Sequence, residues 1–150
     1  MAEIIGQQYR LGVDTTPAAA ATYVNFQNEV TCSLDITAEK LEAASKDTGK
    51  WKKFIKTLLD ATISVTANED AAPTGTNYNY ADVFALSSEN HTDTYGGVRK
   101  FKLSTTVSGG NSIILTGFID SLGTAMENNG LVTYTFKIQQ TAAPVLTPVA

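Results

Sequence analysis

Two side chains of this sequence could serve as the nucleophile or the general base of a hydrolytic site, Cys32 and His91. They are the single cysteine and the single histidine of the chain. A lone cysteine forms no internal disulfide, and a Cys/His metal set is impossible within one chain. Cys32 alternates with Leu34 and Ile36, which favours a small buried core residue over a reactive thiol. His91 lies in a polar run with no partner for base catalysis, so we interpret it as a solvated loop residue.

Paired acids are the other possible source of chemistry. Glu39 with Glu42, and Glu69 with Asp70, lie in polar stretches that give no reason for a raised pKa. Gly96-Gly97 and Gly109-Gly110 lack the spacing and the following helix of a phosphate-binding loop, and no GxSxG, HExxH, CxxC or EF-hand pattern occurs. The sequence therefore predicts no catalytic residue, no metal site and no cofactor.

Composition indicates one ordered domain with neutral polar surfaces. The chain has 150 residues, of which 43% are hydrophobic and only 17% charged, with a net charge of −4. This length fits a single domain spanning residues 1–150, and the acidic balance argues against a surface that grips nucleic acid. No apolar stretch is long enough to cross a bilayer, and residues 1–12 lack the features of a secretory signal. We therefore expect no membrane partner and a start in the cytosol. Few charges also suit burial against further copies of the chain.

Period-two alternation dominates the hydrophobic pattern and predicts antiparallel strands. Inward-facing apolar residues alternate with Thr, Ser or Lys, as in a half-buried sheet. Residues 22–26 alternate more briefly. Residues 112–120 are apolar on both faces, which places them in the middle of a sheet or against a neighbouring subunit. The four clearest strands are expected at 30–37, 62–67, 100–107 and 132–139.

Turn and helix signals complete the expected fold. Gly109 and Gly110 predict a tight hairpin between strands at 98–107 and 112–120. Apolar residues at helical spacing from Trp51 to Leu59 predict a helix over 49–60. The fold class is therefore mainly β, an antiparallel sandwich or barrel with one short flanking helix. We expect extended arms at residues 1–20 and 141–150, and an exposed excursion at 69–79.

The segment from Ser33 to Ala67 resembles the tail tube (major tail) protein family of long-tailed bacteriophages. In that family a strand and a T-A-E segment lead to T-S-K-D-(S/T)-G-x-W-x-x-F and then to another strand. Here the corresponding residues read TAEKLEAASKDTGKWKKF and continue into ATISV, with Ala44 where the family often has Thr or Val. The similarity is weaker over 98–120 and 131–140, and residues 68–97 do not align.

The resemblance implies a structural protein that forms hexameric rings stacked into a hollow tube for genome DNA. It implies a virion tail protein assembled in the host cytoplasm, with terminator, tape measure and tail-tip proteins as partners. Residues of a long loop would contact the adjacent ring, and the terminal arms would bridge subunits, with Trp51 an anchor on its own core or across an interface. The loop residues are Ser45, Lys46, Asp47, Thr48, Gly49, Lys50, Trp51, Lys52, Lys53 and Phe54, and the C-terminal arm residues are Val145, Leu146 and Val149.

Two acids are candidates for the lumen, Asp35 and Asp120, because acidic side chains would repel DNA phosphates and let DNA pass without sticking. Three other functions stay open. The first is a tube subunit of a contractile tail, gene transfer particle or secretion apparatus, which the genomic neighbourhood would separate from a phage tail. The second is a monomeric β-sandwich binding module without self-association. The third is an enzyme whose cleft of titratable groups the sequence does not reveal.

Overall fold

Eight strands and one helix make up the described part of the chain. In this computed structural model the described residues are 8–16, 20–43, 49, 51–69, 77–88, 97–126, 128 and 130–149. The elements are β1 (Tyr9–Asp14), β2 (Tyr23–Asn25), β3 (Glu29–Glu42), β4 (Phe54–Asn68), α1 (Tyr80–Ser88), β5 (Arg99–Thr105), β6 (Asn111–Ala125), β7 (Thr133–Gln140) and β8 (Val145–Pro148).

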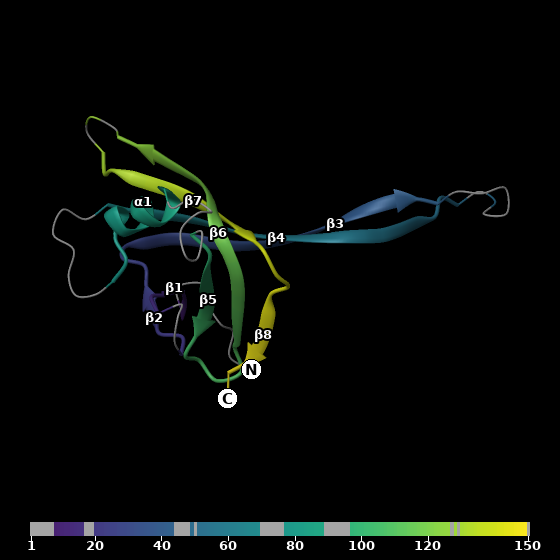
Figure 1. Ribbon diagram of the computed structural model, residues 1–150, viewed down its shortest axis with the longest axis horizontal. Coiled ribbons are helices and arrows are strands. Elements are labelled where there is room, and N and C mark those ends of the chain that lie inside the picture. Colours follow the sequence, from purple (N-terminus) through teal and green to yellow (C-terminus); the bar gives the residue numbers. More distant parts are fainter. Residues whose placement is uncertain are drawn as a thin grey trace.

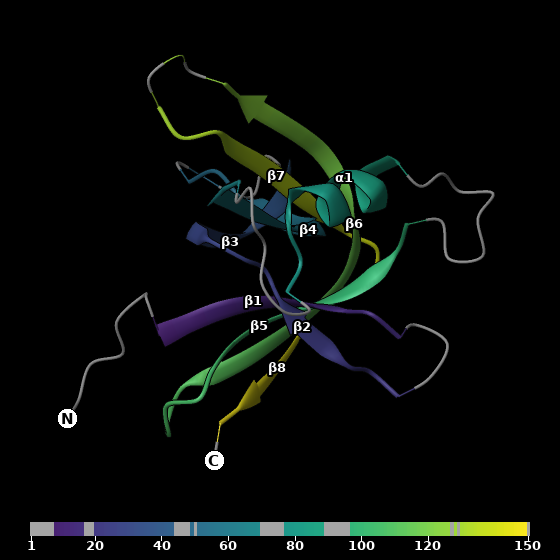
Figure 2. The same ribbon diagram turned by 90° about the vertical axis from the view of Figure 1, so that its left-hand side faces the viewer.

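Strand β6 divides the antiparallel sheet into two layers. The strand order is β2-β1-β5-β6-β7-β4-β3, and β8 pairs with the first residues of β6. Residues 112–117 of β6 pair with β5, whereas residues 117–125 pair with β7. The chain therefore passes at Gly117 from a lower layer (β2, β1, β5, β8) to an upper layer (β7, β4, β3), and Figure 2 shows these layers crossing.

The core lies between the two layers and is closed at one end by α1. Phe26 packs against Phe136 with ring centroids 5.2 Å apart and against Tyr78 edge to face. Helix α1 contributes Val83 and Leu86 to the same core. Aromatic residues of this size bury large apolar areas, so this cluster is the main source of stability. The buried apolar residues are Leu11, Val13, Phe26, Ala61, Ile63, Val65, Ala67, Val83, Leu86, Phe101, Leu115, Ile119, Tyr134, Phe136 and Ile138.

The strands predicted at 62–67, 100–107 and 132–139 are confirmed as the second half of β4, β5 and β7. Their expected inward residues are buried or packed against the core, except Val107 and Val132, which lie just outside the strands and are half-buried. The predicted hairpin at 108–111 is also present, with Gly109 at a φ of +87°. β6 is paired on both sides, as its two apolar faces indicated. The strand predicted at 30–37 lies within a longer β3, but Val30 is exposed at an irregularity between Glu29 and Thr31.

The helix predicted over 49–60 is wrong. Residues 54–60 are the first half of β4 and pair with β3, for example Ile55 with Leu41 and Leu59 with Ala38. The hairpin is free on both faces here, and apolar side chains occupy both. Because apolar residues lie on both faces, the alternation with a period of two is hidden in this part of the sequence, and the spacing of the apolar residues resembles that of a helix. The true helix is α1, which the sequence analysis missed. A capping box was its signal, because Asn79 accepts from the Asp82 N–H and Asp82 accepts from the Asn79 N–H.

The two expected arms are also partly corrected. β1 lies within residues 1–20, and its buried Leu11 and Val13 sit in a strand between β2 and β5. At the other terminus β8 joins the chain's own sheet at an edge, where Pro148 closes the strand. Val149 holds the β5–β6 turn, since its N–H donates to the Gly110 carbonyl and its carbonyl accepts from the Gly109 N–H.

Candidate assembly surface

A two-stranded arm projects from the body of the molecule. We define the arm as residues 36–43 of β3 and its continuation together with residues 51–60 leading into and along β4. In Figure 1 it extends along the longest axis, away from both layers and from α1. The pairing register runs without a break from Glu42 opposite Phe54 to Lys40 opposite Lys56, and resumes after a bulge at Ala38 opposite Leu59. The Thr57 hydroxyl donates to the Glu39 carbonyl at 3.2 Å and ties the strands together at this bulge.

One face of the arm continues the core-facing side of the upper layer. Alternate residues of β4 from Ala61 to Ala67 face the core, and by the same alternation Leu59 lies on that face. Its β3 neighbour Ala38 shares it, as does Ile36 opposite Ala61. Ile36, Ala38 and Leu59 are nevertheless exposed, because none of the described residues covers them. We call these three residues the stripe.

Beyond the bulge the face that carries the stripe becomes charged. Lys40 and Lys56 face each other across the hairpin there, so two like charges stand side by side, and the ammonium of Lys40 lies 5.0 Å from the centroid of the Phe54 ring. The opposite face carries the exposed side chains of Leu41, Ile55 and Leu58. Both faces of the arm therefore expose large apolar residues.

The predicted contact residues lie at the end of this arm. Trp51 is 85% exposed and is not part of the described core, and Lys52, Lys53 and Phe54 are exposed beside it. Gly49 is exposed with a φ of +65°. The described residues of the expected long loop thus lie next to the end of a hairpin, with Phe54 the first residue of β4. Ser45, Lys46, Asp47, Thr48 and Lys50 lie outside the described residues.

The lumen candidates lie on the upper layer, on opposite outer strands. Asp35 is exposed on β3 opposite Thr62, on the side of the sheet that faces away from the core. Asp120 is exposed at the bulge of β6 between Ile119 and Ser121. The rest of that outward side is rich in hydroxyl groups, and the Thr66 and Thr135 hydroxyls lie 3.3 Å apart. The remaining outward residues of β3, β4 and β7 include Thr31, Ser33, Thr62, Ser64, Thr133, Lys137 and Gln139.

The C-terminal residues are placed at the other edge of the body. Val145 and Leu146 are exposed on β8, opposite Ile114 and Ile113 of β6. Val149 is half-buried at the turn described above. Deleting this segment would therefore remove both an edge strand and an exposed apolar pair.

A hollow of about 980 Å³ lies at the end of the body opposite the arm. Leu103 and Ile113 of the lower layer line it, together with the start of β3, including Val30 and Cys32. Leu103 packs against the core, so the hollow is the part of the lower layer's inner side that the upper layer leaves uncovered. Its other lining residues are Tyr9, Arg10, Gln27, Asn28, Glu29, Thr31, Asn77 and Asn111.

The Glu29 carboxylate bridges β1 and β3 at the wall of this hollow. It accepts from the Leu11 N–H at 3.1 Å and lies 3.9 Å from Nε of Arg10, with its side chain only 7% exposed. Burial raises the pKa of Glu29, although the Leu11 N–H and Arg10 act in the opposite direction. Sequence analysis missed this pair, whose available signal was an acid beside the predicted strand at 30–37.

The candidate nucleophile Cys32 is not activated in the structure. Burial, with a smaller effect of Glu29, raises the pKa of the Cys32 thiol to about 12. His91 lies outside the described residues. Within the described ranges, no three His, Cys, Asp or Glu side chains gather closely enough to hold a metal ion. No helix found there is long and apolar enough to span a membrane.

Solved structures with the same arrangement of elements include a phage tail tube and the tail of a gene transfer agent particle. No protein-family model and no curated protein sequence matches the chain. The SPP1 tail tube matches with a TM-score of 0.73 and 15% identity, over 97% of this chain and 80% of that one. The chain has the tail-tube fold. The tail of an empty gene transfer agent particle, refined with C6 symmetry, matches with a TM-score of 0.72 and 17% identity, over 97% of this chain and 99% of the other.

The same tail-tube fold occurs in a contractile injection system. A PVC sheath–tube complex in its extended state matches with a TM-score of 0.67 and 11% identity, over 98% of this chain and 93% of that chain. The resemblance read from residues 33–67 is therefore confirmed as a fold that spans nearly the whole chain. Phage tails, gene transfer agents and injection systems share this fold, so the match does not separate them.

Proposed function

We propose that this protein is a structural subunit that assembles into hexameric rings, which stack into the hollow tube of a tail. The observation that supports it most strongly is the whole-chain match to tail-tube structures, one of them a tail with C6 symmetry. In this proposal the tube is the conduit for genome DNA, and the tail terminator, tape measure and tail-tip proteins are partners. The protein is then a virion component assembled in the host cytoplasm.

The exposed stripe gives an independent physical reason for assembly. Large apolar side chains on one face, continuous with a core, are typical of a surface that another protein covers. Four half-exposed residues of the arm, Ile36 and Leu59 on this face and Leu41 and Ile55 on the other, each gain about 1 kcal/mol when covered and so favour contact between copies. We propose that the arm, including Trp51, and the predicted contact residues 45–50 make contacts between subunits of adjacent rings.

The hydroxyl-rich outward side of β3, β4 and β7 is our candidate for the lumen. Ser and Thr are neutral and offer no positive charge to DNA phosphates, and Asp35 and Asp120 add repulsion. Such a lining lets DNA move along the tube without being held. We propose these two acids as lumen-facing, with the outward threonines beside them.

A long-tailed phage tube is the proposal we favour, because the quoted motif between Ser33 and Ala67 resembles that family. A gene transfer particle is the second candidate, supported by a match that covers 99% of the tail chain of such a particle. Contractile tails and secretion tubes are the remaining variants of the same function. The genes next to this one, for example a sheath gene, distinguish these cases.

Electron microscopy of the concentrated protein, with and without tail-tip proteins as a nucleator, tests the proposal. We expect rings or hollow tubes with sixfold symmetry from the unchanged protein. We expect their loss in Leu59→Asp, and in a deletion of residues 141–150 that remains folded. Leu58→Asp is the matched control for the arm, because Leu58 is the neighbouring residue with a similar exposure and lies on the other face. Monomers under every condition would contradict the tube and favour a monomeric binding module.

A further inference from the structure

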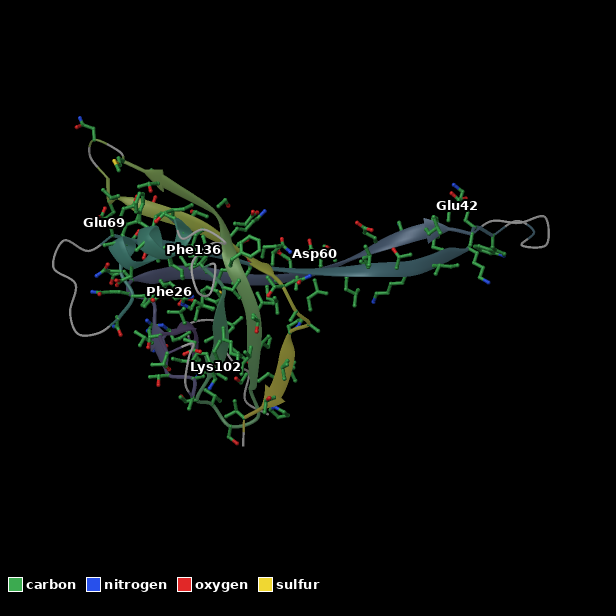
Figure 3. The ribbon with its side chains drawn as sticks, in the orientation of Figure 1. Phe26, Glu42, Asp60, Glu69, Lys102 and Phe136 are labelled. Atoms are coloured by element: carbon green, nitrogen blue, oxygen red, sulfur yellow. The ribbon has the colours of Figure 1, made fainter. Side chains whose placement is uncertain are left out.

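The inner side of the lower layer has an apolar surface that no described residue covers. Leu103 of β5 pairs with Ile113 of β6, and these half-buried side chains form the floor of the hollow. Phe26 and Phe136, labelled in Figure 3, lie where the two layers do face each other, with their ring centroids 5.2 Å apart. The hollow is therefore a place where the sandwich lacks part of its second layer.

We propose that residues 3–7 of the same chain, which precede the described residues, fold back into the hollow and cover its floor. The inference concerns the single subunit and goes beyond the proposed tube. Two adjacent isoleucines followed by a glycine suit this site, because glycine permits the sharp reversal that the chain must make. The segment reads Glu3-Ile4-Ile5-Gly6-Gln7.

The hollow has an apolar wall on each side of the incoming segment. Leu103 and Ile113 lie on the lower layer, whereas Val30 and Cys32 lie on β3 of the upper layer. Adjacent side chains of an extended segment point to opposite sides. One isoleucine of the pair therefore faces the floor while the other faces the start of β3, so both are removed from water.

The segment is attached at the wall of the hollow. Tyr9 is the first residue of β1 and lines the hollow, and its hydroxyl accepts a hydrogen bond from the Asn111 N–H at 3.1 Å. Ile5 lies four residues before Tyr9, and four residues of extended chain span about 13 Å. That reach is longer than the edge of a cube with the volume of the hollow, about 980 Å³. Both isoleucines can therefore reach the floor without any movement of β1.

The short tether favours this segment over a second copy of the chain. A segment joined to its site by a few residues has an effective concentration on the order of millimolar, and free subunits at low micromolar concentration are far more dilute. Because β1 already holds one end of the segment, docking orders only a few further residues. The hollow is then closed within each subunit, and its apolar floor is not available to other proteins before assembly.

The rim of the hollow can pair the polar backbone of the segment. Asn28, Asn77 and Asn111 lie around the floor, and each side-chain amide both donates and accepts hydrogen bonds. Backbone N–H and C=O groups need such partners when they leave water. A docked segment that belongs to no sheet therefore finds hydrogen-bond partners at this rim.

The charges of the hollow also suit this segment. Arg10 and Glu29 are the charged side chains among its described lining residues, and they lie 3.9 Å apart. Glu29 repels a second carboxylate, but its side chain is only 7% exposed and already accepts a hydrogen bond from the Leu11 N–H. The Arg10 side chain is 49% exposed, and a guanidinium has five N–H donors. Arg10 can therefore bind the Glu3 carboxylate as well as that of Glu29.

Cross-linking of the free subunit at low micromolar concentration tests the position of the segment. In a Cys32→Ser background, Ile5→Cys is combined with Val30→Cys at the rim of the hollow and treated with a short bis-maleimide. The control combines Ile5→Cys with Val145→Cys, because Val145 is as exposed as Val30 but lies on the outer side of the lower layer, opposite Ile114. We expect about tenfold more linkage within one chain for the hollow pair, independent of protein concentration. Equal linkage of the two pairs would overturn the inference, and linkage mainly between chains would make a second copy the occupant and overturn it as well.

Alkylation of Cys32 tests the cover without introduced thiols. Cys32 lines the hollow and is the single cysteine of the chain. Ile4→Ser with Ile5→Ser removes the apolar cover, whereas Ile4→Leu with Ile5→Leu keeps one, and circular dichroism checks that both variants fold. We expect the folded serine variant to react with iodoacetamide about threefold faster than the unchanged protein, because the thiol is then more open to solvent, and the leucine variant to react at the unchanged rate. Equal rates for the serine variant and the unchanged protein would contradict the cover. Both measurements use the free subunit, so their outcome does not depend on whether tubes form.

Discussion

A β-carbon at Gly117 would lie 2.1 Å from the carbonyl oxygen of Gln139. The two residues sit on β6 and β7, at the point where β6 leaves the lower layer and enters the upper one. The backbone of β6 must approach β7 this closely to change partners. Glycine is the residue that allows it, because a contact of 2.1 Å with a backbone atom cannot be relieved by a rotamer change.

Gly117→Ala is therefore expected to destabilise the fold, by about 1 to 3 kcal/mol or more, since crowding at a packed backbone contact costs this much. The measurement is the free energy of unfolding in urea. Gly123→Ala on the same strand is the control, because its β-carbon would meet only the Thr135 carbonyl oxygen at 4.0 Å. We expect Gly123→Ala to change stability little. Equal effects at both positions would show that the crossover does not depend on close approach.

Because the pKa of Glu29 is raised, we expect the folded protein to lose stability as the pH rises through the weakly acidic range. Burial raises its pKa above the unfolded value, so the folded state binds the proton more tightly than the unfolded state does. Its contribution to stability is fully present below the unfolded pKa and is lost as the pH rises through the folded pKa. Glu29→Gln keeps an acceptor for the Leu11 N–H and does not titrate. The variant should therefore have a flatter profile of stability against pH than the unchanged protein. An identical profile would exclude Glu29 as the source.

The strands of the sandwich could be predicted from the sequence wherever one face of the strand is buried and the other is exposed to solvent. β7 is the clearest case, because Tyr134, Phe136 and Ile138 alternate with exposed Thr135 and Lys137. Burial on one face imposes the period of two, so periodicity reports it. The same rule identified the β5–β6 hairpin, whose glycine at position 109 has the positive φ that the turn requires.

The arm could not be predicted by the same rule, because its two faces do not differ in burial. Leu58 and Leu59 are neighbours on opposite faces and are 67% and 56% exposed. Apolar residues occur on both faces of the arm because no described residue covers either face. The alternation of apolar and polar residues that marks a half-buried strand is therefore absent there. The hollow was missed for a related reason: Glu29, Leu103 and Ile113 come from three segments whose meeting depends on the register of the strands.

We expect the folded protein to lose stability at alkaline pH because of the buried hydroxyl of Tyr134. Burial raises its pKa to about 12, with smaller effects from Glu69, Asp82 and Glu29. The stability that this group contributes below the unfolded value of 10.0 is lost as the pH rises from that value to about 12. Tyr134→Phe should remove this alkaline loss. At neutral pH we expect the variant to be as stable or up to about 1 kcal/mol more stable, because the buried hydroxyl has no hydrogen-bond partner among the described residues. A clear loss of stability at pH 7 would contradict this.

Cys32 should be unreactive in the folded protein. Its thiol pKa is raised from 9.0 to about 12, so the thiolate fraction at pH 8 falls by about a thousandfold. We expect slow alkylation of the native chain by iodoacetamide and rapid alkylation in denaturant, measured by mass spectrometry. Val30→Cys in the Cys32→Ser background is the exposed control and should react rapidly when folded. Comparable rates for the two native-state thiols would show that Cys32 is open to solvent.

Trp51 provides the most direct report on the arm. It is the single tryptophan of the chain and is 85% exposed, so the free subunit should emit at the long wavelength of an indole in water. If the arm is covered on assembly, its emission shifts to shorter wavelength and quenching by iodide weakens, because water is excluded from the ring. Trp51→Phe, which keeps an aromatic ring at this position, supplies the background emission, and Leu59→Asp is the variant expected to stay folded without assembling. Tubes in which Trp51 stays fully quenchable would place the distal arm in solvent and contradict its role in contact between subunits.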